Sequence, residues 1–370
     1  MAGFSFVLLS LVAVWLIMLG VGQLIAVGWQ LRGASLVGTG RWTGVGLGLL
    51  LLLSGAWLLP ASWLALGWPL LLGPLVVFIF LWTGSINPPP GPAALFEPDH
   101  PAHGSCRRIH IPDNEHAIPA ILLEPPSGIA SRAAVCVIHG AGDHKTFFKS
   151  QLITSLLNKG LTVLTIDLPG HGDYRKRPLS YPEVLSTVPA ALGFMHAQPG
   201  IEAVGLIGIS LGGAIALNSL VDCGRDHLAQ ALVIAGTPIH LQPDRHMFRR
   251  EMWRTLYGSP SLGLLKEMSV KQAWQMWKSG GYRSRLTTSE LFELLNPVEQ
   301  IRPLRLPILL VYSRRDSVAP WRHAQAMQQA APGAAYLETK KASHVMLTLI
   351  PEVAGPIADW LKRKLVEEGN

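Results

Sequence analysis

The most constraining feature of this chain is a serine set between glycines, at the point where an apolar strand-like run meets a helix-like run. The segment reads Gly208-Ile209-Ser210-Leu211-Gly212-Gly213. This G-x-S-x-G pattern predicts a sharp strand-to-helix turn, because the glycines let strand and helix pass closely while the hydroxyl points outward. Ser210 is therefore a candidate nucleophile, and the Leu211 amide is a candidate donor to an oxyanion. The motif alone leaves open a Gly- and Ser-rich strand end without catalytic meaning.

A serine nucleophile needs a histidine base, which in turn needs an orienting carboxylate. Asp316 and His344 each follow an apolar, strand-like run downstream of Ser210. All three residues are then expected at the carboxyl ends of parallel strands, which meet at one edge of an open α/β sheet. The order predicts a triad with His344 as general base and Asp316 as its partner. Asp222 and Asp226 are rivals for the acid, but they follow the helix after Ser210 and would point away.

A second oxyanion donor is expected from the loop 139–144, which follows the strand-like run 133–138. Its two glycines allow the Ala141 amide to face the same point as the Leu211 amide. We expect His139 to brace this loop rather than to transfer a proton.

Another turn, 167–173, follows the strand-like run 162–166, and its Asp167 and His171 are expected to be structural. Histidines and aspartates of the two loops could by composition form a metal site, although no HExxH or paired CxxC spacing supports one. The set is His139, Asp143, His144, Asp167 and His171.

With these motifs, the chain from about Cys106 to its end resembles the α/β-hydrolase superfamily. Its loop 139–144 looks most like that of the monoacylglycerol lipase and lysophospholipase branch. The resemblance implies a mostly parallel eight-stranded sheet with helices on both faces and a helical cap, without metal or organic cofactor. It also implies the roles Ser210 nucleophile, His344 base, Asp316 partner, and Ala141 and Leu211 oxyanion amides.

Strand-like and helix-like runs alternate through this region, which is typical of a parallel sheet covered on both faces. An antiparallel pair is expected first, at 107–111 and 117–123, and helices are expected at 147–159, 184–197 and 211–221.

A long insertion, 237–305, is expected to cover the triad as a cap. Its apolar residues either pack the cap's own helices or line an acyl pocket: Met247, Phe248, Met252, Trp253, Leu256, Tyr257, Met268, Trp274, Met276 and Trp277. Four arginines form a basic face that is either solvated or able to meet anionic lipid headgroups: Arg245, Arg249, Arg250 and Arg254.

The N-terminal part is apolar and predicts a transmembrane region over 1–86. Three spans are expected, at 4–27, 45–59 and 63–82, although the last two could form a hairpin and the first could be a signal peptide. Arg32 and Arg41 lie in the first loop and favour a cytoplasmic catalytic domain. The chain is thus expected to be an integral, multi-pass membrane protein. A Pro-rich linker is expected at 87–104 and the hydrolase domain at 105–370.

Composition narrows the choice of partners. The cysteines Cys106, Cys136 and Cys223 have no close spacing and suggest free thiols in a reducing compartment. A net charge of +7 over 370 residues, without aromatic residues interleaved among basic ones, gives no support for nucleic-acid binding. The expected partners are a small-molecule or lipid ester and the lipid bilayer, and no oligomeric state is predicted.

These features together predict a membrane-anchored serine hydrolase that cleaves carboxylic esters with an apolar acyl chain through an acyl-enzyme. The same triad would serve an acyltransferase or a thioesterase. A third alternative is a membrane scaffold that keeps the fold without turnover.

Overall fold

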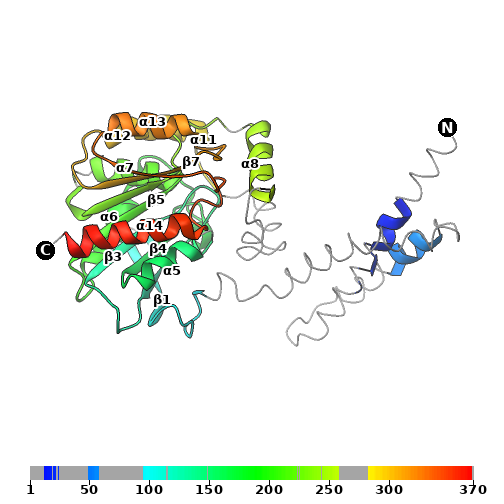
Figure 1. The fold of residues 1–370 in the computed structure, drawn as a ribbon, viewed down its shortest axis with the longest axis horizontal. Coiled ribbons are helices and arrows are strands. Elements are labelled where there is room, and N and C mark those ends of the chain that lie inside the picture. The colour runs from blue at the N-terminus through cyan, green and yellow to red at the C-terminus, as the bar shows by residue number, and fades with distance from the viewer. Residues whose placement is uncertain are drawn as a thin grey trace. The chain divides into compact units, whose positions relative to one another are not determined.

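An eight-stranded sheet is the centre of the larger part of the structure (Figure 1). The computed structural model describes residues 12–18, 20–21, 24, 49–57, 95–113, 116–147, 149–222, 224, 226–242, 244–257 and 282–368. The strands lie in the order β1-β2-β4-β3-β5-β6-β7-β8. Their bounds are Ser105–Asp113, His116–Glu124, Ala133–Ile138, Thr162–Ile166, Ala203–Ile209, Ala231–Ala235, Ile308–Ser313 and Ala335–Thr339 for β1 to β8.

The first two strands pair antiparallel, as does β2 with β4, and all later pairs are parallel. This sheet confirms the predicted mostly parallel, eight-stranded sheet. Its strands are apolar because they are buried on both faces. In β3, Ala134, Cys136 and Ile138 face one core, and the alternate residues face the other. Cys136 and Cys106 are free thiols, whereas Cys223 lies outside the described residues.

Helices cover both faces of the sheet. The helices α5, Ser150–Asn158, and α14, Pro351–Lys362, lie side by side over one face (Figure 1). The other face packs against α6, Thr187–His196, α7, Leu211–Asp222, and α13, Trp321–Ala330. These positions agree with the predicted helices, except that α5 begins three residues after the predicted start at 147 and residues 183–186 form a 3-10 turn before α6.

The insertion between β6 and β7 contains three described helices. They are α8, Arg245–Tyr257, α11, Thr288–Leu295, and α12, Pro297–Ile301. A capping box starts α11, because Thr287 and Glu290 each accept a hydrogen bond from the other's backbone amide. The apolar side of α11 joins the core that also contains α6 and α7. Residues 258–281 of the predicted cap, with Met268, Trp274, Met276 and Trp277, lie outside the described residues.

The predicted linker 87–104 is described from residue 95 onward. There Leu95 and Phe96 are only 3% exposed and belong to the core under α5 and α14. The His103 Nε2 atom lies 2.9 Å from the Leu95 carbonyl oxygen and ties this segment to the start of β1.

By its contacts the chain divides into two compact units, Met1–Pro89 with Met268–Trp274, and Pro90–Glu267 with Gln275–Asn370. The first unit is described at two short helical runs, 12–18 and 49–57, and at three further residues. These runs pack closely, since a Cβ atom at Gly55 would lie 2.6 Å from Ile17 Cγ1 and 2.7 Å from the Ala13 oxygen.

The prediction of an integral, multi-pass membrane protein with a cytoplasmic catalytic domain is wrong. Among the described residues no helix is both long and apolar enough to cross a membrane. The predicted span 63–82, and the rest of the spans 4–27 and 45–59, lie outside the described residues. The predicted contact with a lipid bilayer therefore has no support in the part of the chain that is described.

Candidate functional site

Ser210 lies at the sharp turn between β5 and α7. Its φ angle is 52°, a left-handed conformation that residues with side chains rarely adopt. Two hydrogen bonds hold this strained backbone in place. The Ser210 amide donates to the Ala235 oxygen at 2.8 Å, and the Thr237 hydroxyl donates to the Ser210 oxygen at 2.9 Å. The turn leaves Ser210 8% exposed, beyond the end of its strand.

The glycines around Ser210 are required by close backbone contacts. A Cβ atom at Gly208 would lie 2.4 Å from the Gly213 Cα atom, and one at Gly212 would lie 2.5 Å from the Ile138 oxygen. Real Cβ atoms essentially never approach within 3.0 Å. The strand and the helix on either side of Ser210 can therefore pass this closely only without side chains at these positions.

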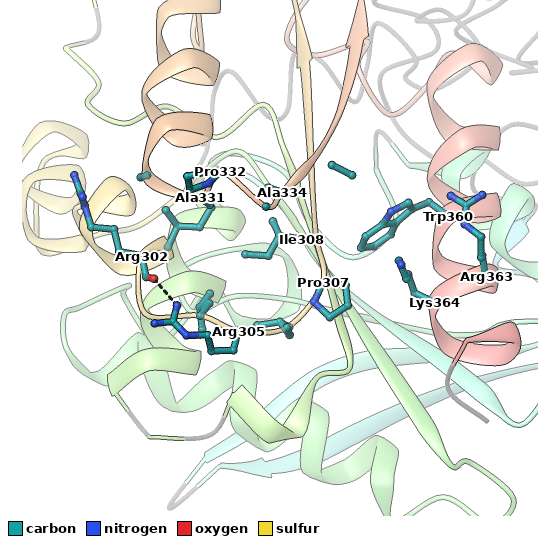
Figure 2. Close-up of a pocket in the computed structure, with 16 residues that line it drawn as sticks. Arg302, Arg305, Pro307, Ile308, Ala331, Pro332, Ala334, Trp360, Arg363 and Lys364 are labelled. Atoms are coloured by element: carbon teal, nitrogen blue, oxygen red, sulfur yellow. Dashed lines mark hydrogen bonds between the residues drawn. The ribbon is translucent and has the colours of Figure 1, made fainter.

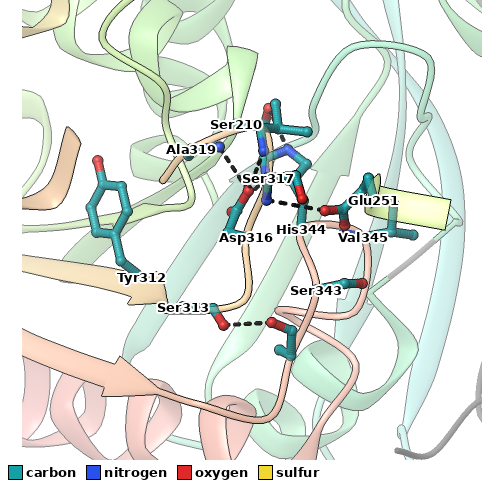
Figure 3. Close-up of polar contacts among 12 residues, drawn as sticks. Ser210, Glu251, Tyr312, Ser313, Asp316, Ser317, Ala319, Ser343, His344 and Val345 are labelled. Atoms are coloured by element: carbon teal, nitrogen blue, oxygen red, sulfur yellow. Dashed lines mark hydrogen bonds and ion pairs between the residues drawn. The ribbon is translucent and has the colours of Figure 1, made fainter. Parts of the chain in front are cut away.

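The structure brings Ser210, His344 and Asp316 together (Figure 3). His344 Nε2 lies 3.0 Å from Ser210 Oγ, and His344 Nδ1 lies 2.7 Å from Asp316 Oδ2. Asp316 follows β7 and His344 follows β8, so both lie at carboxyl ends of parallel strands, as predicted. A carboxylate only accepts hydrogen bonds, which assigns the imidazole proton to Nδ1 and leaves Nε2 as the acceptor for the serine hydroxyl.

The carboxylate of Asp316 is fixed by its own loop. Its Oδ1 atom accepts hydrogen bonds from the amides of Val318 and Ala319, each at 2.7 Å. With His344 on Oδ2, both oxygens have donors, and the Asp316 side chain is fully buried. The imidazole of His344 is therefore held by a carboxylate that cannot rotate freely.

The electrostatic surroundings make His344 a stronger base than an ordinary histidine. Burial lowers the pKa of His344, but the charge of Asp316, its hydrogen bond and the charge of Glu251 outweigh burial and raise that pKa above its usual 6.5. The imidazolium that forms when His344 takes a proton is thus stabilised in place.

Both loops predicted to supply oxyanion amides lie beside the serine. Leu211 is the first residue of α7, and the first four amides of a helix have no acceptor within it. On the other loop, a Cβ atom at Gly140 would lie 3.0 Å from Ser210 Cβ and 3.6 Å from Ser210 Oγ. The next residue is Ala141, and Gly142 then turns the chain with a φ angle of 74°.

His139 braces the loop that carries Ala141, as predicted. The Leu168 amide donates to His139 Nε2 at 3.0 Å, so Nδ1 carries the proton and donates to the Gly140 oxygen at 2.8 Å. His139 is fully buried, and burial lowers its pKa well below the ordinary value. His139 therefore stays neutral and links two loops of the site.

The aspartates considered for a metal site are instead paired with lysines. Lys149 Nζ lies 2.8 Å from Asp143 Oδ2, and Lys145 Nζ lies 2.5 Å from Asp167 and 2.6 Å from Asp173. Burial raises the pKa of Asp143 to about 6, although Lys149 acts in the opposite direction. Among the residues that the structure describes, no group of three or more His, Cys, Asp or Glu side chains could hold a metal ion.

The rival acids lie far from the base. Asp222 ends α7, about 17 Å along the helix from its first residue, Leu211, at 1.5 Å per residue, and Asp226 begins a 3-10 turn beyond it.

Sequence reasoning missed one acidic side chain at this site, Glu251 of α8. Its carboxylate accepts hydrogen bonds from the amides of Ser317, at 3.1 Å, and Val345, at 3.4 Å (Figure 3). The signal that could have indicated it is a single acid within a basic helix. Of the predicted basic face, Arg249 and Arg250 are exposed.

A cavity of about 620 Å³ lies at the end of the sheet opposite Ser210, between the starts of β7 and β8 and the end of α14 (Figure 2). Its walls include Ile308, Trp360 and four basic side chains, Arg302, Arg305, Arg363 and Lys364. Since β7 runs from Ile308 to Ser313, its length of about 20 Å separates this cavity from the Asp316 loop. The cavity is therefore distinct from the triad.

Comparison with known proteins gives a family match over most of the large unit. Residues 134–354 match the model described as "Alpha/beta hydrolase family". No curated protein matches the chain. Among solved structures, a 2,6-dihydroxy-pseudo-oxynicotine hydrolase shares 19% identity at a TM-score of 0.52, with 71% of this chain and 69% of that chain covered.

Two further structures are similar over their full length. A bromoperoxidase from Bacillus anthracis shares 16% identity at a TM-score of 0.53, covering 69% of this chain and 100% of its own. DcsB, solved with a substrate analogue, shares 16% identity at a TM-score of 0.54, covering 71% of this chain and 100% of its own. At such identities these likenesses establish the fold alone.

Proposed function

Because the chain belongs to the alpha/beta hydrolase family, we propose that it is a serine hydrolase that cleaves carboxylic esters through Ser210, His344 and Asp316. Membership of this family supports a hydrolase with a small-molecule substrate. The observation that carries the proposal is the continuous chain of hydrogen bonds from Ser210 Oγ through the imidazole to Asp316, at 3.0 and 2.7 Å. The monoacylglycerol lipase or lysophospholipase branch stays a prediction, since the comparisons do not resolve a branch.

The geometry suits a two-step acyl transfer. His344 Nε2 takes the Ser210 proton as Oγ attacks the ester carbonyl, and the amides of Ala141 and Leu211 donate to the oxyanion. His344 then returns the proton to the leaving alcohol. A water activated by the same imidazole hydrolyses the acyl-enzyme and restores Ser210. Asp316 keeps the imidazole in the required tautomer throughout.

The proposed acyl group is apolar. Support comes from α8, which contacts the loops of both Asp316 and His344 and carries apolar residues such as Met247 in its sequence. Apolar and Met-rich walls suit a flexible acyl chain. For p-nitrophenyl esters from acetate to octanoate, we expect kcat/KM to rise with chain length. A preference for acetate would remove this part of the proposal.

The proposed chemistry is tested by ester turnover of two serine variants. Ser210→Ala should lower kcat at least about 10⁴-fold, because it removes the nucleophile. Ser219→Ala is the matched control, since this buried hydroxyl on α7 has no hydrogen-bond partner among the described residues. Equal activity in wild type and Ser210→Ala would overturn the proposal.

Acyl transfer and thioester cleavage remain alternatives that use the same triad. Product analysis with an added alcohol distinguishes acyl transfer from hydrolysis, because a hydrolase releases mainly free acid and a transferase mainly the new ester. Comparison of kcat/KM for an oxygen ester and for the matched thioester distinguishes an esterase from a thioesterase.

A further inference from the structure

The helix α8 presents three polar side chains toward the loops of the triad. Glu251, Arg254 and Thr255 are spaced i, i+3 and i+4, so they share one face of the helix. Glu251 is 7% exposed and Thr255 is 6% exposed. Polar groups in such surroundings need partners, and the described partners of these three side chains lie on two loops.

Glu251 joins the two loops directly. Its Oε2 atom accepts from the amide of Ser317, the residue after Asp316, at 3.1 Å. Its Oε1 atom accepts from the amide of Val345, the residue after His344, at 3.4 Å. One carboxylate therefore bridges the neighbours of the triad acid and of the triad base.

The other two side chains hold the same loops from the same helix. Arg254 Nη1 donates to the Arg315 oxygen at 3.0 Å and to Ser317 Oγ at 2.9 Å. The Thr255 and Ser343 hydroxyls share a hydrogen bond of 2.7 Å. These contacts lie on both sides of Asp316 and on the residue that precedes His344.

The charge of Glu251 also acts on His344. Within the described part of the chain Glu251 has no ion-pair partner. The negative charges of Asp316 and Glu251 both raise the pKa of His344. His323 and Tyr312 lie near Asp316. Burial lowers the pKa of His323 to about 4 and raises that of Tyr312, so both are neutral near pH 7. Among the described residues, the charges that act on the pKa of His344 are those of two carboxylates, Asp316 and Glu251.

We propose that Glu251 is a positioning residue, which fixes the Asp316 and His344 loops relative to each other and stabilises the imidazolium with a second negative charge. This inference rests on the proposed function, since it concerns the same triad. Glu251 acts through His344 and does not need to touch the substrate. Because α8 belongs to the insertion between β6 and β7, the insertion then takes part in assembling the catalytic groups.

The charge is tested with Glu251→Gln, which keeps the shape and one acceptor oxygen but loses the charge. We expect the acid limb of the kcat/KM profile to move to lower pH, because the imidazolium loses stabilisation. We also expect kcat to fall roughly fivefold to tenfold with KM unchanged. Glu293→Gln removes an exposed carboxylate on α11 and serves as the matched control, with a profile like wild type. A Glu251→Gln profile equal to that of Glu293→Gln overturns the proposal.

The reach of the side chain is tested with Glu251→Asp, which keeps the charge but shortens the bridge. Its acid limb should stay closer to wild type than that of Glu251→Gln, while its kcat falls. If Glu251→Asp and Glu251→Gln instead give the same acid limb of the kcat/KM profile, the charge of Glu251 has no role and the proposal fails.

Titration of the His344 ring by NMR, assigned with His344→Ala, gives a readout that does not depend on turnover. A lower His344 pKa in Glu251→Gln supports the positioning role even if no ester is cleaved, and an unchanged pKa overturns it. Absence of ester turnover in wild type would instead overturn the proposed function alone.

Discussion

At the scale of single residues, Ser210 shows how a strained backbone is maintained by close packing around it. Hydrogen bonds to Ala235 and from Thr237 hold the left-handed φ angle of Ser210, and the glycines beside it allow the surrounding backbone to approach closely. Gly212 is the clearest part of this arrangement, since its Cα lies against the backbone of β3. A small change here should affect stability and activity together.

We predict that Gly212→Ala lowers the free energy of unfolding by about 2 kcal/mol or more, because the added Cβ atom would lie 2.5 Å from the Ile138 oxygen. Gly193→Ala in α6 is the control. Apart from its chain neighbours and the backbone of its own helix, no described atom lies within 4 Å of its added Cβ, and the loss of helix-interior glycine should stabilise by roughly 0.5–1 kcal/mol. Urea denaturation measures both, and equal effects would contradict the packing described for the turn.

The second residue-scale prediction concerns pH. The pKa of His344 is raised above its usual value of 6.5, and the base works only when unprotonated. As pH falls through this raised pKa, kcat/KM should fall, with a midpoint above that of an ordinary histidine. Asp316→Asn should lower kcat by about 10⁴-fold, because it no longer holds the required tautomer. A midpoint below 6.5 in wild type would contradict the electrostatics of the site.

At the scale of elements, buried ion pairs connect the loop after β3 to its neighbours. Lys149 is fully buried at the start of α5, and its partner Asp143 lies in the loop 139–144 that carries Ala141. Removing one partner of a buried pair leaves an uncompensated charge, which costs far more than the loss of an exposed pair. The position of Ala141 thus depends on Lys149.

Lys149→Met should therefore lower the free energy of unfolding by about 3 kcal/mol. The matched control is Lys159→Met at the other end of α5, where the partner Asp359 is exposed and the cost should be about 1 kcal/mol or less. Thermal and urea unfolding of the two variants measure the difference. A cost for Lys149→Met as small as for Lys159→Met would show that the buried pair does not hold the loop.

At the scale of the whole molecule, the sheet was the most predictable part. Strands such as 133–138 and 162–166 are buried on both faces, so they appear in the sequence as short apolar runs bounded by turns. The three triad residues follow such runs. Their approach to one another was therefore predictable from sheet topology, although their catalytic roles remain proposals.

Other features depend on contacts that no local pattern contains. Glu251 bonds to Ser317 and Val345, which lie 66 and 94 residues away in the sequence. No periodicity within α8 could indicate these partners.

The apolar runs of the N-terminal part led to a wrong prediction because only their local pattern was considered. Their local hydropathy suggested spans, whereas among the described residues no helix is both long and apolar enough to cross a membrane.

The most direct test of the account is covalent labelling of the whole protein with a fluorophosphonate, followed by peptide mass spectrometry. An activated serine reacts with this probe only when its base is in place. We expect one adduct, on Ser210, in wild type, and a rate lower by at least about 10³-fold in His344→Ala. No adduct, an adduct on another residue, or equal labelling without His344 would contradict the claim that Ser210 is a nucleophile activated by His344.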